Sequence, residues 1–247
     1  METTIRKSLL YKSGVGVFCI NHVQGCSHGC RYPCYAYMMA QSYGRVATYA
    51  DWCQSKLVAN AAELLKKELA HKKVKPDSIH LCLSTDPFMN GYPEVTEMSL
   101  KLMDIINSFG IRCSILTKGK LPAELADLKR FSVNNLYGIS LISLNEEFRK
   151  RWEPGAAPYA ERISALRCIH DSGLQTLVHI EPYPTPNLLK QNLEDILEAV
   201  GFVDHLYFSG WNYNVQVKQF QNYQQFYSDQ TRLAQHFCKE HGIAFNC

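Results

Sequence analysis

Short apolar runs of the strand type alternate along the chain with segments of helical periodicity. The runs predict strands over residues 15–20, 78–83, 112–117, 136–141, 176–180 and 205–209. Apolar residues at helical spacing predict helices over residues 51–69, 94–109, 121–131, 159–171, 188–200 and 224–241. Strands that alternate with helices indicate parallel βαβ units, so the pattern predicts an α/β fold.

Six such units in 247 residues fit either an open doubly wound sheet or an incomplete barrel. The hydrophobic content of 46% is enough for a full core. No linker rich in Pro, Gly or Ser divides the chain. We therefore predict one domain over residues 1–247.

Polar residues follow every predicted strand. In parallel α/β folds the ligand site lies at the carboxyl ends of the strands. The polar residues at these ends are Asn21, His22, Ser84, Thr85, Asp86, Thr117, Lys118, Ser140, Glu181 and Asn212. A single polar strand end carries little information, because loops are polar in general. Six polar ends on one rim favour a binding site there.

Charge and targeting signals indicate where the protein is found in the cell and which partners it is expected to have. The formal net charge is +3, and five lysines gather where the first predicted helix ends, a position that the helix dipole favours. Residues 1–12 contain no long apolar stretch, and no run approaches 18 apolar residues. We expect a soluble, cytoplasmic protein with no membrane partner. In a reducing compartment its ten cysteines do not suggest disulfides.

Three of these cysteines lie together in the loop at residues 21–36. Cys26, Cys30 and Cys34 fall within nine residues, after the first predicted strand. Thiolates are soft ligands that suit zinc or iron–sulfur clusters. A structural zinc site takes four ligands, and His22 or His28 could complete the set. Three close cysteines without a second pair favour a cluster with one open iron, and zinc stays the alternative. Most other cysteines, including Cys82, Cys113, Cys168 and Cys238, are predicted to pack in the core.

The segment Gly-Cys-Ser-His-Gly-Cys-Arg-Tyr-Pro-Cys-Tyr-Ala at residues 25–36 resembles the cysteine motif of the radical S-adenosylmethionine (SAM) superfamily. The branch that includes spore photoproduct lyase is the most similar, and the small radical SAM mobile pair proteins share the length and the loop. Collinear matches at residues 84–86, 117–118, 153–155, 162 and 181–182 extend the resemblance over most of the chain. The usual spacing is CxxxCxxC, whereas Pro33 makes it CxxxCxxxC here.

The resemblance implies a partial (β/α)6 barrel with a [4Fe–4S] cluster on Cys26, Cys30 and Cys34. It also implies SAM bound at the open iron, and reductive cleavage of SAM to a 5′-deoxyadenosyl radical that abstracts hydrogen from a substrate. The residues that it places around SAM are Tyr32, Tyr35, Ser84, Thr85, Asp86, Lys118, Ser140 and Glu181. Arg162 is expected to pair within its helix or with Glu153 instead.

The substrate stays open among nucleic acid, peptide and small metabolite. Spore photoproduct lyase has a cysteine at the end of its second strand, where this chain has Leu83. The neighbouring Cys82 should point away from the site, because side chains alternate along a strand. We therefore predict that the protein is not a photoproduct lyase.

Expected partners are a reductant such as flavodoxin or ferredoxin and a second radical SAM protein. The alternative function is a zinc-binding module that recognises nucleic acid without catalysis. Aromatic residues are dense between positions 207 and 227, and we expect them to form core or interface in preference to a stacking wall for nucleobases.

Overall fold

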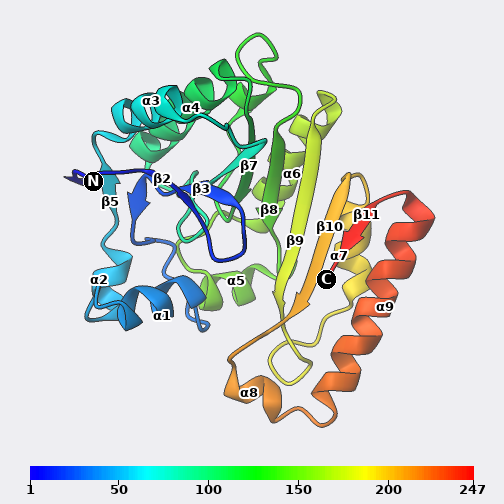
Figure 1. Cartoon of the computed structure of the whole chain (residues 1–247). Helices are drawn as coiled ribbons and strands as arrows, with labels where there is room; N and C mark the ends of the chain where they lie inside the picture. The colour runs from blue at the N-terminus through cyan, green and yellow to red at the C-terminus, as the bar shows by residue number, and fades with distance from the viewer.

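An eight-stranded sheet forms the centre of the protein in the computed structural model, which describes residues 1–247 (Figure 1). Its strands are β2 (Leu10–Lys12), β3 (Phe18–Ile20), β6 (Ser78–Leu81), β7 (Arg112–Thr117), β8 (Leu136–Ser140), β9 (Gln175–Tyr183), β10 (His205–Gly210) and β11 (Ala244–Asn246). They lie in the order β11-β10-β9-β8-β7-β6-β3-β2. Only β2 is antiparallel to its neighbour.

The six predicted strands are the six consecutive neighbours from β3 to β10. Their order in space follows their order in the chain without the reversal that marks a doubly wound sheet. The helices that contact β7, β8, β9 and β10 are α4, α6 and α9. They lie along the outer face of the sheet. The edge strands β2 and β11 do not pair with each other, so the barrel stays open. The sheet is therefore an incomplete parallel barrel, as predicted.

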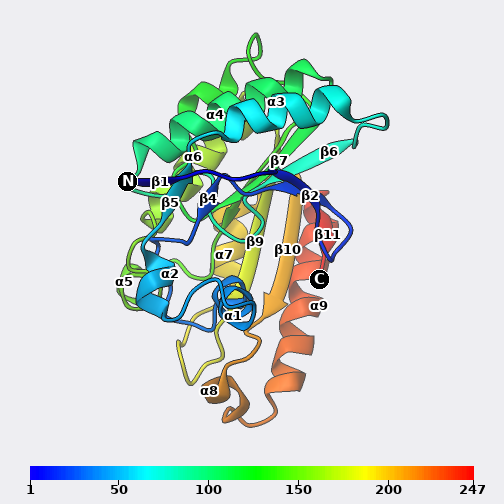
Figure 2. The ribbon, with the colours of Figure 1, turned by 60° about the vertical axis from the view of Figure 1, so that its left-hand side comes forward.

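Two groups of helices surround this sheet (Figure 2). The helices along the strands are α3 (Ala61–His71), α4 (Pro93–Ser108), α6 (Tyr159–Asp171), α7 (Leu193–Val200) and α9 (Tyr223–His241). The short helices at the carboxyl ends of the strands are α1 (Tyr35–Ser42), α2 (Tyr49–Cys53), α5 (Glu146–Trp152) and α8 (Val215–Lys218). The carboxyl ends of β9 and β10 point down in Figure 1.

Alternation along the strands separates a core face from a polar face. Ile79 and Leu81 of β6, Ile115 of β7 and Val178 of β9 belong to a core of 47 buried residues that packs against the helices. The residues between them are only partly buried and include His80, Ser114 and His179. A strand places successive side chains on opposite faces, so these polar residues lie on the inner, concave face.

A second, small sheet contradicts the predicted helix over residues 51–69. Here α2 ends at Cys53, β5 (Lys56–Val58) follows, and α3 begins only at Ala61. Strand β5 lies between β1 (Glu2–Thr4) and β4 (Val23–Gln24). The spacing of Leu57 and the later leucines suits a helix, but pairing with two distant strands overrides it.

Other predictions need smaller corrections. The helix predicted over residues 121–131 is a single 3-10 turn at Ala123–Ala126, which directly follows Pro122. The first predicted strand begins at Phe18, and the helix predicted from residue 188 begins at Leu193. Cys168 is exposed and not a core residue, whereas Cys82, Cys113 and Cys238 are buried. None of the helices is both long enough and apolar enough to span a bilayer.

Candidate functional site

The three clustered cysteines lie on one loop at the carboxyl ends of the strands. Gly25 begins this loop with a φ of +78°, and a Cβ there would lie 2.4 Å from the carbonyl oxygen of Trp52. The amide of Cys26 donates to that same oxygen at 2.9 Å. Cys34 is the last residue before α1, and none of the three thiols forms a disulfide. The loop therefore presents three free sulfur ligands.

The chemistry of these thiols decides which metal group they fit. No three His, Cys, Asp or Glu side chains converge closely enough to hold one ion. Burial raises the pKa of Cys26, and the neighbouring Cys30 and Asp86 raise it further. Burial likewise raises the pKa of Cys30 to about 12. A single zinc ion, with Zn–S bonds of about 2.3 Å, would draw its thiolates together. In a four-iron cluster each thiolate binds a different iron, and three thiolates leave one iron open for a ligand, so the donor set fits such a cluster.

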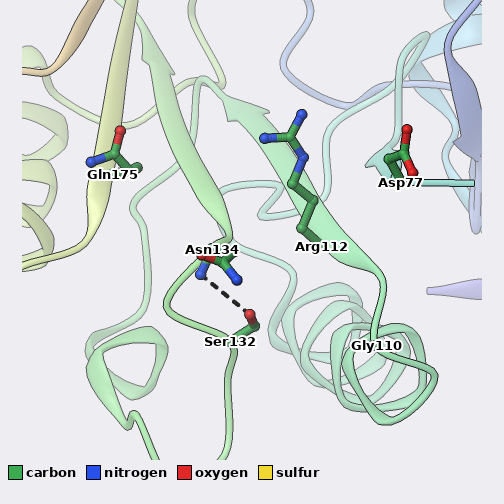
Figure 3. Close-up of a pocket in the computed structure, with 6 residues that line it drawn as sticks. All are labelled: Asp77, Gly110, Arg112, Ser132, Asn134 and Gln175. Carbon is green, nitrogen blue, oxygen red and sulfur yellow. Dashed lines mark hydrogen bonds between the residues drawn. The ribbon is translucent and has the colours of Figure 1, made fainter.

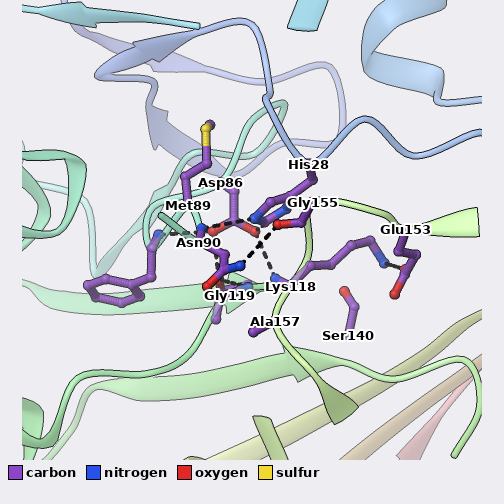
Figure 4. A network of polar contacts seen from close by, with 12 residues as sticks. His28, Asp86, Met89, Asn90, Lys118, Gly119, Ser140, Glu153, Gly155 and Ala157 are labelled. Atoms are coloured by element: carbon purple, nitrogen blue, oxygen red, sulfur yellow. Dashed lines mark hydrogen bonds and ion pairs between the residues drawn. The ribbon is translucent and has the colours of Figure 1, made fainter. Parts of the chain in front are cut away.

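His28 connects the first half of the loop to the residues that follow β6 through polar contacts (Figure 4). Its Nδ1 lies 3.5 Å from Oδ2 of Asp86, and its Nε2 accepts the amide of Asn90 at 3.2 Å. Asp86 also accepts the Thr117 hydroxyl at 2.6 Å and the Lys118 amide at 2.7 Å. This carboxylate therefore joins the cysteine loop, β6 and β7.

Glu153 fastens the second half of the loop. Its carboxylate accepts from the Tyr32 hydroxyl at 2.9 Å and pairs with Lys118 at 2.8 Å and Arg162 at 3.0 Å. The side chains of Glu153 and Arg162 are both 0% exposed. Burial alone would raise the pKa of Glu153, but the charges of Lys118 and Arg162 outweigh it and lower that pKa to about 2. The expected pairing of Arg162 with Glu153 is thus confirmed.

The other residues predicted around SAM lie near the same strand ends. The Tyr35 hydroxyl donates to the carbonyl of Leu83 at 2.5 Å, and Ser84 accepts from Asn21 at 2.8 Å. The Thr85 hydroxyl donates to the carbonyl of Val23 at 3.3 Å. Ser140 is buried close to the Lys118 and Glu153 side chains (Figure 4).

Glu181 faces the same region from β9. Burial raises the pKa of its carboxyl group, and the nearby charge of Lys118 opposes that shift. Tyr32 is 9% exposed, and its ring meets Trp211 edge-on at 5.6 Å, so its place is in the core under the loop.

Two histidines mark the concave face beside these strand ends. His80 and Ser114 are direct partners in the β6–β7 register, and their side chains are 2.9 Å apart. His179 and Tyr207 are partners in the β9–β10 register, and their rings stack at 4.6 Å. Burial lowers the pKa of both histidines to about 4. The face therefore offers neutral hydrogen-bonding groups near pH 7.

His22 and these two partly buried histidines predict a loss of stability in acid. His22 is 0% exposed, and burial lowers its pKa to about 3, against about 4 for His80 and His179. Below about pH 6.5 the unfolded chain binds protons that the folded protein excludes, so folding weakens as the pH falls. Urea titrations of the metal-free protein should show up to about 1.4 kcal/mol lost per pH unit for each histidine between about pH 6 and 4.5. His179→Gln should make the slope shallower, and an unchanged slope would contradict this assignment.

The close approach of Gly155 to the cysteine loop leaves no room for a side chain. A Cβ on Gly155 would lie 2.6 Å from the carbonyl oxygen of Ser27 and 2.9 Å from Cα of His28. Gly155→Ala should therefore displace the loop and lower the free energy of unfolding by about 1–3 kcal/mol. Iron uptake should fall as well. Gly14→Ala is the control, because nothing lies within 4 Å of the Cβ that it adds. Equal iron uptake by the two variants would argue against this contact.

Comparison with known proteins identifies the family. The sequence pattern of the radical SAM superfamily matches residues 20–203. The chain belongs to the radical SAM superfamily. This radical SAM chain is 26% identical over 211 residues to an uncharacterized protein of Methanocaldococcus jannaschii, covering 83% of this chain and 74% of that one. It is 24% identical over 186 residues to an uncharacterized protein of Acidianus two-tailed virus, covering 73% of this chain. It spans only 60% of the viral protein.

Solved structures confirm the radical SAM fold. A spore photoproduct lyase with bound AdoMet and dinucleoside spore photoproduct superposes with a TM-score of 0.70 at 13% identity. The match covers 98% of this chain and 80% of that one. The radical SAM methyltransferase TsrM from Kitasatospora setae, with tryptophan and a SAM analog bound, reaches 0.52 over 77% of this chain and 35% of its own, at 14% identity.

The candidate site contains two residues whose roles the sequence does not predict. His28 is expected there only as a possible zinc ligand, and Glu153 only within the collinear match at residues 153–155 and as a partner of Arg162. The sequence signal for both was weak, because each is a single polar residue in a loop.

The polar hollow of about 360 Å³ in Figure 3 lies at the opposite, amino ends of the strands and includes Asp77 and Arg112. It is therefore separate from the site.

Proposed function

We propose that this protein is a radical SAM enzyme that binds a [4Fe–4S] cluster through Cys26, Cys30 and Cys34. When bound, cluster and SAM supply reductive cleavage to a 5′-deoxyadenosyl radical that abstracts hydrogen from the substrate. One observation carries the proposal: three free thiols share one clamped loop at the carboxyl ends of a radical SAM barrel. The thiols must lose their protons when metal binds, so cluster assembly releases protons.

Lys118 is the residue we propose for the carboxylate of SAM. Its ammonium has three N–H donors, and one of them is directed to Glu153 at 2.8 Å. Its side chain is 17% exposed, so the remaining donors can reach a ligand. Ser140 lies close to it, Glu181 faces the same region from β9, and Ser84, Thr85 and Tyr35 lie around the end of β6. We propose that these groups orient SAM.

Asp86 has a different part in this proposal. Its two oxygens already accept from the Thr117 hydroxyl and from the amides of Phe88 and Lys118, and His28 lies beside them. A carboxylate offers about four lone-pair sites. We therefore propose that Asp86 supports SAM binding by fixing His28 and the backbone of Lys118.

The substrate would lie on the concave face, against His80, Ser114, His179 and Tyr207. In parallel barrels the reacting groups lie at the carboxyl ends of the strands, and this face adjoins them. Cys82 packs away from it, with Val23, Leu57, Met89 and Val95. That placement supports the prediction that the protein is not a photoproduct lyase. The substrate itself is unidentified.

The test is an anaerobic SAM cleavage assay. The protein is reconstituted with iron and sulfide, reduced with dithionite and given SAM, and 5′-deoxyadenosine is measured by mass spectrometry. We expect iron and sulfide in the protein and 5′-deoxyadenosine in the products. Zinc without sulfide would support the zinc-binding module instead. Replacing dithionite with flavodoxin or ferredoxin tests the proposed electron donor.

A further inference from the structure

One carboxylate oxygen joins the cysteine loop to the end of β7. Oε1 of Glu153 accepts both the Tyr32 hydroxyl at 2.9 Å and the Lys118 ammonium at 2.8 Å. Tyr32 lies between the second and third cysteines, and Lys118 directly follows β7. We propose that Glu153 is a positioning residue, which sets the cysteine loop and the Lys118 cation relative to each other. This inference rests on the proposed function of the same site.

Arg162 binds the second oxygen of the Glu153 carboxylate and fixes its position. Oε2 of Glu153 accepts from Arg162 at 3.0 Å, and Arg162 donates further to the carbonyls of Ala157 and Ser140, each at 2.8 Å. These bonds attach Glu153 to α6 and to the end of β8. Because Glu153 is 0% exposed, water does not compete for its oxygens. The position of the Glu153 carboxylate is therefore fixed by α6 and β8.

Of the two cations that pair with Glu153, Lys118 is the one that can reach a ligand. Arg162 is 0% exposed and donates to Glu153, Ala157 and Ser140, whereas Lys118 is 17% exposed. Glu153 therefore fixes the position of the one ammonium that faces the site.

The Tyr32 hydroxyl donates to Glu153 at 2.9 Å, and the Cys30 thiol is its other polar neighbour. The Tyr32 ring is enclosed by Trp211 at 5.6 Å and by the Lys118 ammonium at 5.5 Å from the ring centroid. The adjacent amide of Arg31 donates to the carbonyl of Trp152 at 2.8 Å, one residue before Glu153. The second half of the loop is thus attached to residues 152–153 twice. Loss of the Tyr32 hydroxyl would halve that attachment.

Tyr32→Phe removes the bond to Glu153 together with the contact to the Cys30 thiol, and it leaves the pairs of Glu153 with Lys118 and Arg162 in place. Glu153→Asp, which keeps the Tyr32 hydroxyl, separates the two contacts. Tyr137→Phe is the matched control: Tyr137, in β8, is also buried (0% exposed, against 9% for Tyr32), and its hydroxyl accepts one bond from Asn135 at 3.1 Å. Hydrogen exchange is measured first, on the cluster-free full-length proteins. We expect Tyr32→Phe to speed exchange at residues 26–34 by about tenfold or more, since a bond to a charged group is lost. Tyr137→Phe should leave those residues unchanged.

Electron paramagnetic resonance of the reduced, reconstituted proteins gives the second measurement. SAM should change the wild-type spectrum, and Tyr32→Phe should raise the SAM concentration for half of that change by about 10- to 100-fold. Glu153→Asp, whose shorter side chain cannot reach all three partners, should do the same. A role confined to stability would leave this concentration as in Tyr137→Phe.

The outcomes separate the two hypotheses. If Tyr32→Phe matches Tyr137→Phe in exchange at residues 26–34, Glu153 does not position the loop, whatever the cluster does. If the wild-type spectrum does not respond to SAM, the proposed function fails. Exchange in the cluster-free protein then still decides whether Glu153 holds the loop. If Glu153→Asp does not fold, Tyr32→Phe alone gives the answer.

Discussion

Replacing Cys30 with alanine is expected to abolish the production of 5′-deoxyadenosine. Cys30 is the middle of the three thiols on the loop, and it is 9% exposed. Changes around a metal site typically cost about 10- to 100-fold, and loss of a ligand should cost more. We expect product to fall by more than about a hundredfold, together with most of the bound iron. Mass spectrometry and an iron assay on the reconstituted protein measure the two effects.

Cys168→Ala is the control for this experiment. Cys168 is an exposed free cysteine on α6, outside the cysteine loop. It should keep wild-type iron content and activity, which excludes a general effect of removing a thiol. Circular dichroism should find both variants folded. Full activity of Cys30→Ala would remove Cys30 from the ligand set.

Replacing Arg162 with methionine is expected to cause the largest loss of stability. Arg162 is 0% exposed, and methionine would leave the buried Glu153 carboxylate with Lys118 as its single cation. The carbonyls of Ala157 and Ser140 would also lose their donor. Breaking a buried ion pair from one side costs about 3–5 kcal/mol. Urea denaturation should find a loss of this size, a large part of the stability of a typical domain.

Arg232→Met is the matched control for that variant. Arg232 also pairs with a carboxylate, that of Asp229 at 2.6 Å, but its side chain is 66% exposed. Exposed pairs contribute about 0–1 kcal/mol, so this change should be nearly neutral. Similar losses in the two variants would mean that the burial of Arg162 does not determine its contribution.

Local sequence patterns predicted the elements whose contacts are local or repeated. The bounds of β7 and α6 agree with the prediction to the residue. The helix predicted over residues 51–69 was wrong because β5 exists only through its pairing with β1 and β4, which lie far away in the chain. Periodicity within a window contains no information about such partners.

The site was predictable as far as its chemistry lay in one motif. Cys26, Cys30 and Cys34 are close in sequence and share a loop, and Lys118 and Ser140 follow from their strand ends. Glu153 could not be assigned its role in the same way. Its partners Tyr32 and Lys118 come from segments more than 30 residues away, and only the folded chain brings them to one oxygen.

The small sheet of β1, β5 and β4 has a consequence for how the cysteine motif can vary. The antiparallel pairing of β4 with β5 closes the base of the segment at residues 25–55, which carries all three cysteines. The main sheet is paired entirely through strands outside that segment. An added residue such as Pro33 therefore lengthens the segment between β4 and β5 and does not shift the register of any strand pair. The spacing of the cysteines can therefore differ by one residue without any change in the pairing of the barrel strands.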